Sequence, residues 1–355
     1  MRLRQKIAQM LVMGFSGCEI DKHSPVVNWI KDLGLGGVLL FDFDVKTKSY
    51  GKNLKNREQI KRLTADLSSY ADNDGLPLFV AIDYEGGAVD RLKKIDESLL
   101  TMQACDQALL SDEELSHEAE KMALLLKELG FNVNFAPVVD LNLNGEQGII
   151  GKLGRSFSSN PSEVVRASKL FVKEFNNHGI ACAYKHFPGH GSASGDTHEG
   201  FVDVSDSFDP KELIPYEMLL NDQNLPQAMV MTAHVINKQL DNSGIPATLS
   251  HKIITDILRK KIGFKGLIIS DDLQMQAIAN HYSIDESLSL TINAGADLII
   301  FGNQLGDITA TEVVDRIENL VEAGKISIAR IEDAYNRVAR FKEELFSHSA
   351  EGIAI

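Results

Sequence analysis

The amino-acid sequence predicts an α/β protein built as a single (β/α)8 barrel of the TIM type, with closing helices at its C-terminal end. Short apolar runs rich in Val, Ile and Phe alternate with longer amphipathic stretches, which is the pattern of parallel strands joined by crossover helices. The runs GLIIS and ADLIIF are apolar almost throughout, as expected for strands that are buried on both faces. An open, doubly wound sheet is the second fold that this pattern allows.

Eight apolar runs have the length of strands, and amphipathic stretches separate most of them. The predicted strands are residues 11–14, 37–41, 78–82, 133–139, 181–184, 228–232, 267–270 and 297–301. The predicted helices are residues 57–69, 112–129, 161–177, 210–220, 251–260 and 284–293, followed by two closing helices at 308–323 and 328–346. The residues before the first strand are expected to form a short helix that leads into it.

The chain of 355 residues is long for one compact core but ordinary for a barrel with insertions. Its hydrophobic fraction of 44% and charged fraction of 24% are those of a globular protein, and no segment resembles a linker. We therefore expect one catalytic domain over residues 1–346 and a tail over residues 347–355.

Charge and cysteine content exclude several classes of partner. The net charge is −14, from 36 basic and 50 acidic residues spread along the chain, which argues against nucleic-acid binding. The three cysteines are far apart, without a CxxC pair, so neither a disulfide framework nor a zinc knuckle is indicated. The basic and then apolar start of the chain is interrupted by polar residues, and no run approaches the roughly 18 apolar residues of a membrane span. We expect a cytoplasmic protein, or a periplasmic one if an export signal has been removed.

Polar side chains follow several of the predicted strands at the point where each strand ends. They are Asp83, Glu85 and Arg91 after the third strand, Asp140 and Asn142 after the fourth, Lys185, His186 and His190 after the fifth, His234 after the sixth, and Asp271 and Asp272 after the seventh. Because the carboxyl ends of barrel strands form one face, these side chains are expected to converge on one pocket.

Each of these residues also has an ordinary structural interpretation. Asp140 and Asp272 could cap a turn or a helix, His234 is more often structural than catalytic, and Lys185 could be a surface residue. Together these interpretations are weaker, because a barrel has no structural need for so many charges at one end and each buried charge would need a partner.

The motifs around these residues resemble those of glycoside hydrolase family 3, and within it the single-domain β-N-acetylglucosaminidases. The most specific match is the run KHFPGHG at 185–191, followed by Asp196-Thr197-His198. Further agreement comes from DYEGG at 83–87, APVVD at 136–140, GRSF at 154–157, MTAHV at 231–235 and SDDLQM at 270–275, which follow the family's order over roughly residues 5 to 300.

The resemblance implies a retaining enzyme that removes terminal β-linked N-acetylglucosamine, from peptidoglycan fragments, through a covalent glycosyl-enzyme. It implies Asp271 as the nucleophile and His198 as the acid/base, oriented by Asp196. It further implies that sugar hydroxyls are held by Asp83, Arg91, Arg155, Lys185, His186 and His190. No metal and no other cofactor is implied, the partner is a small carbohydrate, and we expect a monomer or a weak homodimer.

The chemistry of glycoside hydrolysis agrees with these roles. A retaining mechanism needs a carboxylate below the anomeric carbon and a proton donor beside the leaving oxygen, which Asp271 and His198 can supply. A histidine has an ordinary pKa near 6.5 and so gives and takes a proton around neutrality, while Asp196 would fix its tautomer. The Gly-rich stretch 189–200 is expected to be a loop that closes over the sugar.

The sequence departs from the common family pattern at three places. Tyr84 stands where Gln is usual, and Ala88 where Arg is common, so contacts beyond the terminal sugar are in doubt. Residues 42–53 are longer than the short turn of many relatives. We favour a solvated loop for this stretch over a lid or a dimer contact.

Three other functions stay open from the sequence. A metal-dependent barrel hydrolase could use as ligands His186, His190, Asp196, His198, His234 and Asp271, although the spacing of known zinc motifs is absent. A barrel that binds sugar without catalysis is compatible with Ala88. A β-glycoside phosphorylase would use the same site, because a neutral histidine tolerates an anionic acceptor.

Overall fold

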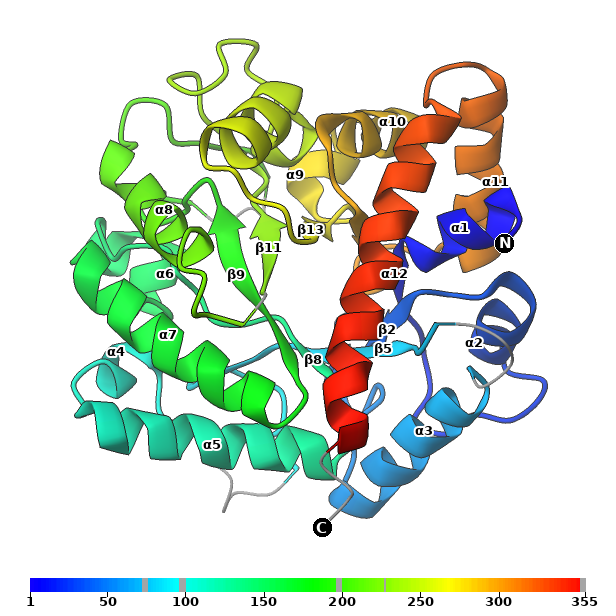
Figure 1. The fold of residues 1–355 in the computed structure, drawn as a ribbon, viewed down its shortest axis with the longest axis horizontal. Coiled ribbons are helices and arrows are strands. Elements are labelled where there is room, and N and C mark those ends of the chain that lie inside the picture. The colour runs from blue at the N-terminus through cyan, green and yellow to red at the C-terminus, as the bar shows by residue number, and fades with distance from the viewer. Residues whose placement is uncertain (72–75, 96–99, 196–199, 227, 352–355) are drawn as a thin grey trace.

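The computed structural model describes residues 1–71, 76–95, 100–195, 200–226 and 228–351, and it confirms the predicted closed barrel of eight parallel strands (Figure 1). Around the barrel the strands follow the order β1-β14-β13-β11-β9-β8-β5-β2, and β2 pairs with β1 to close the ring. Their bounds are β1 Leu11–Gly14, β2 Gly37–Leu39, β5 Phe79–Ile82, β8 Val133–Asn134, β9 Ala181–Phe187, β11 Met229–Thr232, β13 Ile268–Asp272 and β14 Leu298–Phe301.

Two strands extend further than predicted, and the extension contains residues of the expected site. Lys185 and His186 lie inside β9, and Asp271 and Asp272 lie inside β13, so the prediction that these residues follow their strands was wrong. The apolar pattern ends before the backbone pairing does, because the last residues of each strand remain in the ladder with polar side chains. The pairing there is irregular, with a register shift in both the β9–β11 and the β13–β14 ladders.

The fourth strand shows the opposite difference, since only Val133 and Asn134 form regular strand where residues 133–139 were predicted. The Asn134 side chain accepts from the backbone N of Tyr84 at 3.0 Å and donates to its carbonyl O at 3.0 Å. This buried amide therefore fixes the chain where it leaves β5.

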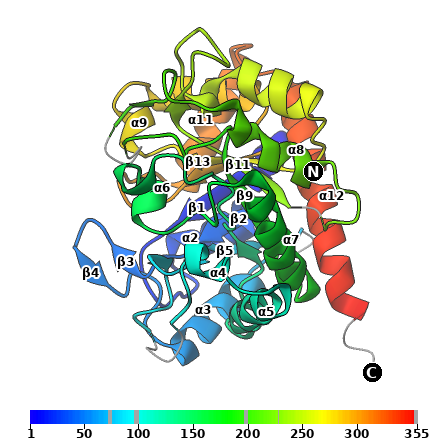
Figure 2. The same cartoon turned by 90° about the vertical axis from the view of Figure 1, so that its left-hand side faces the viewer.

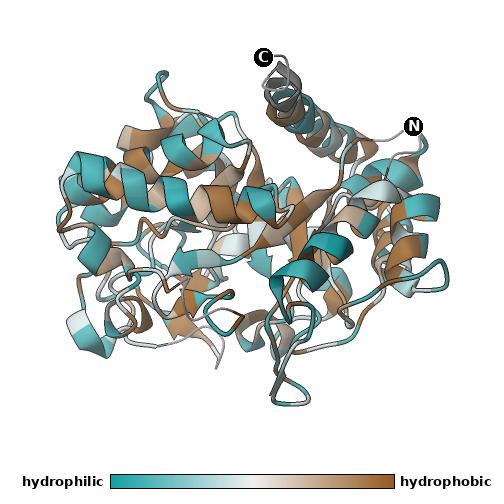
Figure 3. Cartoon of the chain, turned by 90° about the horizontal axis from the view of Figure 1, so that it is seen from below, coloured by the Kyte–Doolittle hydropathy of each residue, from teal (hydrophilic) through white to brown (hydrophobic). Residues whose placement is uncertain are grey.

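The crossover helices lie outside the barrel, and most have the predicted bounds within one or two residues. The longer ones are α1 Leu3–Gln9, α3 Arg57–Ser69, α5 Asp112–Glu128, α7 Pro161–Asn177, α8 Ile214–Leu220, α10 Ile284–Ala294, α11 Ala310–Glu322 and α12 Ile328–Glu351. Short helices at α2 Pro25–Asn28, α4 Ala104–Gln107, α6 Ile149–Lys152 and α9 Gln276–Ala279 were not predicted. The predicted helix at 210–220 begins with a 3-10 turn, and the one at 251–260 is a π-helix over Lys252–Lys261. Apolar faces of the helices pack on the barrel while their polar faces point outward (Figure 3).

Capping boxes explain where three of these helices begin. Ser111, Ser283 and Thr309 each accept a hydrogen bond from a backbone N three residues later, and the glutamate at that position bonds back to the cap. This reciprocal pairing satisfies backbone donors that the first helical turn leaves free.

The two ends of the barrel differ, because a helix covers one of them and a hairpin projects from the other. Val338 and Phe341 of α12 pack into the apolar cluster that fills the barrel interior, so α12 seals one end. At the opposite end a hairpin of β3 Phe43–Asp44 and β4 Ser49–Tyr50 projects from the barrel, as Figure 2 shows. Over the part of the chain that the structure describes, no helix is both long and apolar enough to cross a bilayer.

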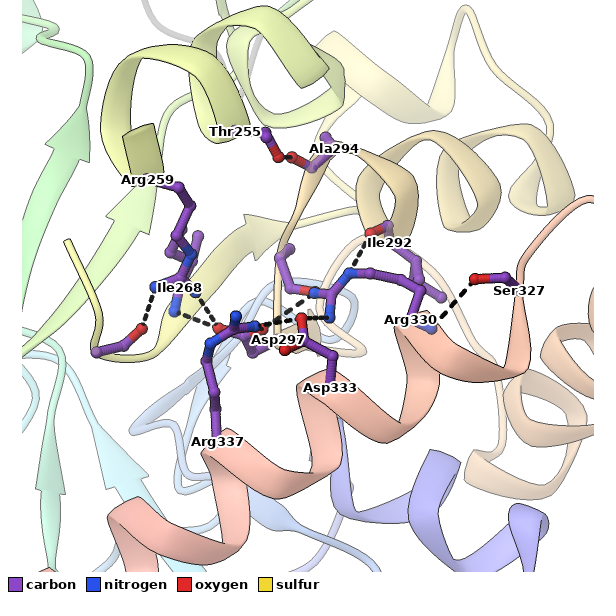
Figure 4. Close-up of polar contacts among 12 residues, drawn as sticks. Thr255, Arg259, Ile268, Ile292, Ala294, Asp297, Ser327, Arg330, Asp333 and Arg337 are labelled. Carbon is purple, nitrogen blue, oxygen red and sulfur yellow. Dashed lines mark hydrogen bonds and ion pairs between the residues drawn. The ribbon is translucent and has the colours of Figure 1, made fainter. Parts of the chain in front are cut away.

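An arginine cluster joins α12 to the barrel at its sealed end (Figure 4). The fully buried carboxylate of Asp297, just before β14, accepts from Arg330 at 3.0 Å, from Arg337 at 3.1 Å and from Arg259. It also accepts from the backbone N of Ile268 at 3.1 Å. Burial lowers the pKa of Arg259 to about 10 even though Asp297 opposes this shift. We call these four side chains, Asp297, Arg259, Arg330 and Arg337, the lower network.

Candidate active site

A cavity of about 450 Å³ opens at the carboxyl ends of the strands, at the barrel end opposite α12. It has the size of a small-ligand pocket. Seven of the nine predicted site residues line it: Asp83, Arg91, Arg155, Lys185, His186, His190 and Asp271. The other two, Asp196 and His198, lie outside the described residues.

Glu85 is the centre of a buried group of charges on one side of the cavity. Its carboxylate accepts two hydrogen bonds from Arg155, one from Nε at 2.8 Å and one from Nη2 at 2.7 Å. The Nζ of Lys185 lies 2.7 Å from the Glu85 carboxylate and 3.0 Å from that of Asp83. We call these four side chains, Asp83, Glu85, Arg155 and Lys185, the upper network.

The upper network is ionised because its charges compensate one another. Burial would raise the pKa of Glu85, but the Arg155 and Lys185 cations outweigh this and hold it well below its usual range. Burial would lower the pKa of Lys185, but Asp83 and Glu85 bring it above its ordinary value. Lys185 is thus a buried, paired cation rather than the surface residue that its sequence context allowed.

A second pair places an imidazole on the cavity wall. The Nδ1 of His186 lies 2.7 Å from Asp140, which also accepts from the backbone N of His186 and of His190. Burial would raise the pKa of Asp140, but His186 and these hydrogen bonds lower it overall. Because an ionised carboxylate can only accept, Nδ1 of His186 carries the hydrogen and Nε2 is left for a ligand. Burial lowers the pKa of His190 to about 4, so that ring is neutral at neutral pH.

Arg91 reaches the cavity beside two carboxylates but is held less tightly. Its guanidinium lies 3.6 Å from Asp42 and 3.8 Å from Asp83, which are ion-pair distances longer than a hydrogen bond. It also lies over the ring of Phe41, 5.7 Å from the centroid. Arg91 therefore places positive charge between the upper network and the start of the β3–β4 hairpin.

Asp271 lies at the end of β13, with its side chain on the cavity wall. Its Oδ1 accepts from the backbone N of Asp272 at 2.8 Å, which fixes the carboxylate relative to the strand. His234 is buried behind this strand end, and its Nε2 donates to the carbonyl O of Asp272 at 2.9 Å. His234 thus positions the end of β13 and does not line the cavity.

The stretch after β9 is anchored below the cavity by a carboxyl group that the sequence analysis missed. Glu212 is buried, and its Oε2 accepts from the backbone N of Gly191 at 2.8 Å. A Cβ at Gly189 would lie 2.6 Å from Glu212, so the chain passes too close for a larger residue. Burial, with Asp140 nearby, raises the pKa of Glu212 to about 7.

Three acidic residues thus carry contacts that the prediction did not assign. The sequence places Glu85 at a strand end but not in the site, although DYEGG contains it, and it leaves a turn or helix cap as the other interpretation of Asp140. Glu212 follows a Pro in a helix start and has no sequence signal of its own. All three are recognisable only once the basic or backbone groups that they contact are located in space.

The stretch 42–53 is not simply a solvated loop, as was favoured. Residues 45–50 are exposed, but Phe43 and Val45 line the cavity, and Lys52 and Asn53 are buried. The Asn53 side chain accepts from the backbone N of Phe41 at 3.0 Å. The prediction failed because the polar composition of the tip hides two cavity-facing apolar residues.

The two single-residue departures have different settings. Tyr84 is buried and faces the core rather than the cavity, and burial raises its pKa. The carbonyl O of Ala88 accepts from Lys93 at 3.3 Å, and its neighbour Val89 lines the cavity. Among the side chains that the structure describes, no three His, Cys, Asp or Glu residues gather closely enough to hold a metal ion.

Comparison with known proteins gives the family. The family model of the glycosyl hydrolase family 3 N-terminal domain matches residues 2–341. The chain is 32% identical to β-hexosaminidase A of Pseudoalteromonas piscicida, covering 89% of this chain and 54% of that protein. It is 30% identical to the β-hexosaminidase of Tolumonas auensis, covering 94% of this chain and 98% of that protein.

A solved structure agrees with these matches. The glycoside hydrolase family 3 β-N-acetylglucosaminidase of Paenibacillus sp. FPU-7 superposes with a TM-score of 0.84 at 30% identity, covering 97% of this chain and 63% of that one. This chain thus spans between about half and nearly all of the length of the relatives that it matches. The chain belongs to glycoside hydrolase family 3, among relatives that are β-hexosaminidases.

Proposed function

We propose that this protein is a retaining exo-β-N-acetylglucosaminidase that releases terminal β-linked N-acetylglucosamine through a glycosyl-enzyme on Asp271. The observation that carries the proposal is that the Asp271 carboxylate, at the end of β13, lines the same cavity as the buried upper network. A carboxylate beside a set of fixed hydroxyl-binding groups is the arrangement that a retaining glycosidase needs. The family and the names of the relatives support the same activity.

In the proposed reaction Asp271 attacks the anomeric carbon as the bond to the leaving oxygen breaks. His198 gives its proton to that oxygen, and the aglycone departs as an alcohol. A water molecule then loses a proton to His198 and attacks the same carbon, which releases Asp271 and leaves the sugar with its original β configuration. Asp196 would hold the imidazole in the required tautomer. These two residues follow directly after the described stretch that Glu212 and Asp140 anchor.

The upper network supplies the proposed contacts to the sugar. Lys185 and Arg155 offer N–H donors and are held by Glu85, while Asp83, held by Lys185, offers carboxylate oxygens as acceptors. Groups that are fixed in advance lose little freedom when the sugar binds, so their hydrogen bonds can favour the transition state. His186 adds Nε2 as a further polar group on the same wall.

The exo mode is the one that the sequence resemblance implies, and a closed floor of the cavity is compatible with it. Below the cavity the barrel interior is filled by apolar side chains, up to Val338 and Phe341 of α12. A sugar chain cannot pass through the barrel, and we propose that a terminal residue occupies the bottom of the cavity. As the natural substrate we propose a peptidoglycan fragment that ends in β-linked N-acetylglucosamine, which is the substrate that the sequence resemblance implies.

A trapping experiment tests the nucleophile. The protein is incubated with a fluorinated N-acetylglucosaminyl substrate whose glycosyl-enzyme is hydrolysed slowly, and the labelled peptide is identified by mass spectrometry. We expect the label on Asp271 and, with an ordinary substrate, a β-configured first product by NMR. A label on another residue, or an α-configured first product, would refute the proposal.

Two added conditions separate the other functions. Activity that a chelator removes and zinc restores would indicate the metal-dependent hydrolase. A sugar 1-phosphate formed in phosphate buffer would indicate the phosphorylase. Absence of any release from a chromogenic β-N-acetylglucosaminide over several pH values would indicate a barrel that only binds sugar.

A further inference from the structure

We propose that the β3–β4 hairpin and the loop 303–307 after β14 form a rigid apolar wall that binds the aglycone through a flat apolar face. This inference rests on the proposed glycosidase function, because it assigns the part of the cavity that the terminal sugar does not need. The wall consists of Phe43, Val45 and Leu305, all of which line the cavity that contains Asp271.

The hairpin is held to the loop after β14 by bonds from both segments. The side chain of Gln304 donates to the carbonyl O of Phe43 at 2.8 Å and accepts from the backbone N of Val45 at 3.2 Å. The buried Nζ of Lys52 donates to the carbonyl O of Asn303 at 2.5 Å. These contacts bracket the two cavity-facing residues of the hairpin, so the hairpin is a fixed wall rather than a lid.

The loop side of the wall is fixed as well. Asn303 donates to the carbonyl O of Gly14 at 2.9 Å and to that of Ile308 at 3.0 Å, and it accepts from Gln274 at 3.0 Å. Asn303 thereby ties the end of β1, the turn after β13 and the start of the α11 crossover together. Leu305 therefore follows two residues, Asn303 and Gln304, whose side chains are hydrogen-bonded to neighbouring segments.

The residues that face the cavity from this wall are apolar and partly exposed. Val45 is 42% exposed and Leu305 is 41% exposed, although they come from segments about 260 positions apart in the chain. Phe43 is half-buried and meets Tyr50 edge to face, with 5.1 Å between ring centroids. Apolar groups that converge on an open cavity gain free energy when a ligand with an apolar face covers them.

The lysines of the hairpin segment, Lys46, Lys48 and Lys52, do not line the cavity. Lys46 pairs with Asp307 and donates to the carbonyl O of Gly306 at 2.9 Å, while Lys52 is used inside the wall. Arg91, which borders the hairpin, faces Asp42 and Asp83. Recognition on this side therefore depends on shape and apolar contact.

The cavity has a polar part and an apolar part, which we assign to the terminal sugar and to the aglycone. Polar groups come from the ends of β5, β9 and β13, where they suit the hydroxyls of the terminal sugar. The hairpin and the loop after β14 supply apolar contacts and lie toward the exposed rim, through which the aglycone of an exo-acting enzyme must extend. The preferred aglycone is thus one with a flat apolar face, such as an aryl ring or the C–H face of a sugar ring.

The test compares two substrates that differ only in the aglycone. They are 4-nitrophenyl β-N-acetylglucosaminide and β-N-acetylglucosaminyl fluoride, whose leaving group is a single atom. For the double variant Val45→Ser with Leu305→Ser we expect kcat/KM to fall about tenfold on the aryl glycoside, and to stay within about twofold on the fluoride. Both residues are exposed enough that the variant should fold, which its thermal unfolding checks. Leu124→Ser is the matched control, because Leu124 is 47% exposed and lies on α5 away from the cavity.

The outcomes separate this inference from the proposed function. An equal fall on both substrates would mean that the wall touches the terminal sugar, and no fall on either would mean that it touches no ligand. Each of these results would overturn the inference while leaving the glycosidase assignment in place. An unaltered protein that hydrolyses neither substrate would instead refute the proposed function itself.

Discussion

The upper and the lower networks are two buried ion clusters at opposite ends of one barrel. Each is centred on a carboxylate, Glu85 above and Asp297 below, which binds two or three cations. In the lower network two of the three arginines are also bonded to backbone carbonyl groups, Arg330 to Ile292 at 2.9 Å and Arg259 to Gly266 at 2.5 Å. In the upper network all four side chains line a cavity instead.

The difference shows what separates a structural ion cluster from a binding site. A buried ion pair by itself adds little to stability, because the desolvation of both ions offsets their attraction. Loss of one partner, however, leaves an unpaired buried charge that strongly destabilises the folded state. The lower network satisfies its donors within the protein, so its effect is to join α12 to the barrel. The upper network keeps donors and acceptors beside an empty volume, where hydroxyl groups can use them.

The largest effect that we predict is a loss of activity from a substitution in the cavity beside the upper network. Asp271→Asn should lower kcat/KM by about 10⁴-fold or more, because the amide cannot form the glycosyl-enzyme. The unfolding midpoint should stay close to that of the unaltered protein, since Asp271 lies on the cavity wall. Steady-state kinetics and thermal unfolding measure the two quantities. A variant that keeps more than a tenth of the activity would exclude Asp271 as the nucleophile.

The second prediction is a loss of stability when the carboxylate at the centre of the lower network is removed. Asp297→Asn should cost about 3–5 kcal/mol of unfolding free energy, because three arginines lose their counter-charge in a buried place. The folded fraction should keep its kcat and KM, which distinguishes this network from the upper one. Denaturant unfolding and kinetics at low temperature give these values.

A control on the same helix sharpens this result. Asp333 also pairs with Arg330 and Arg337, but its side chain is 49% exposed. Asp333→Asn should therefore cost less than about 1 kcal/mol, as for other surface ion pairs. Equal losses in the Asp297 and Asp333 variants would show that burial does not set the strength of this cluster.

The third effect concerns Glu212, a carboxyl group that no cation pairs with among the residues that the structure describes. The pKa of Glu212 rises from 4.5 to about 7 on folding, so the folded state binds more protons than the unfolded state between these values. Stability from this group is therefore present below pH 4.5 and is lost as the pH rises to about 7. Glu212→Gln removes this loss and keeps an acceptor for Gly191, so it should be more stable than the unaltered protein at pH 8, by up to about 3 kcal/mol.

The pH dependence of this variant is the measurement that matters. The stability difference between Glu212→Gln and the unaltered protein should be small at pH 4.5 and should grow up to pH 7. A constant difference from pH 5 to pH 8 would mean that Glu212 does not titrate in this range.

The fold was predictable because the signal of a parallel barrel is regular. Continuous apolar runs such as residues 298–301 allow few structures other than a strand that is buried on both faces. The short helix α6 was missed because it has four residues, too few for a periodic pattern. The ends of β9 and β13 were misplaced because Lys185 and Asp271 are polar, and hydropathy does not show that backbone pairing continues past them.

The site was only partly predictable for a related reason. Motifs pointed to the residues that face the cavity, such as Lys185 and Asp271, but not to the residues that hold them. Glu85 and Asp140 were visible as acidic residues, yet their partners Arg155 and His186 lie 70 and 46 positions away in the chain. The hairpin wall was hidden because Phe43 and Val45 stand in a largely polar segment. Which apolar residues face a cavity is decided by tertiary contacts.

The closure of the barrel by α12, together with the pairing of β1 with β14, determines the order in which this protein can fold during its synthesis. The first strand pairs with β2 early, but its second neighbour is made only some 290 residues later, because Leu11 pairs with Ile299. At ordinary rates of translation the nascent chain must then wait roughly 15–60 s with β1 unclosed on that side. Val338 and Phe341 emerge later still, so the apolar cluster inside the barrel is completed only after α12 has been made.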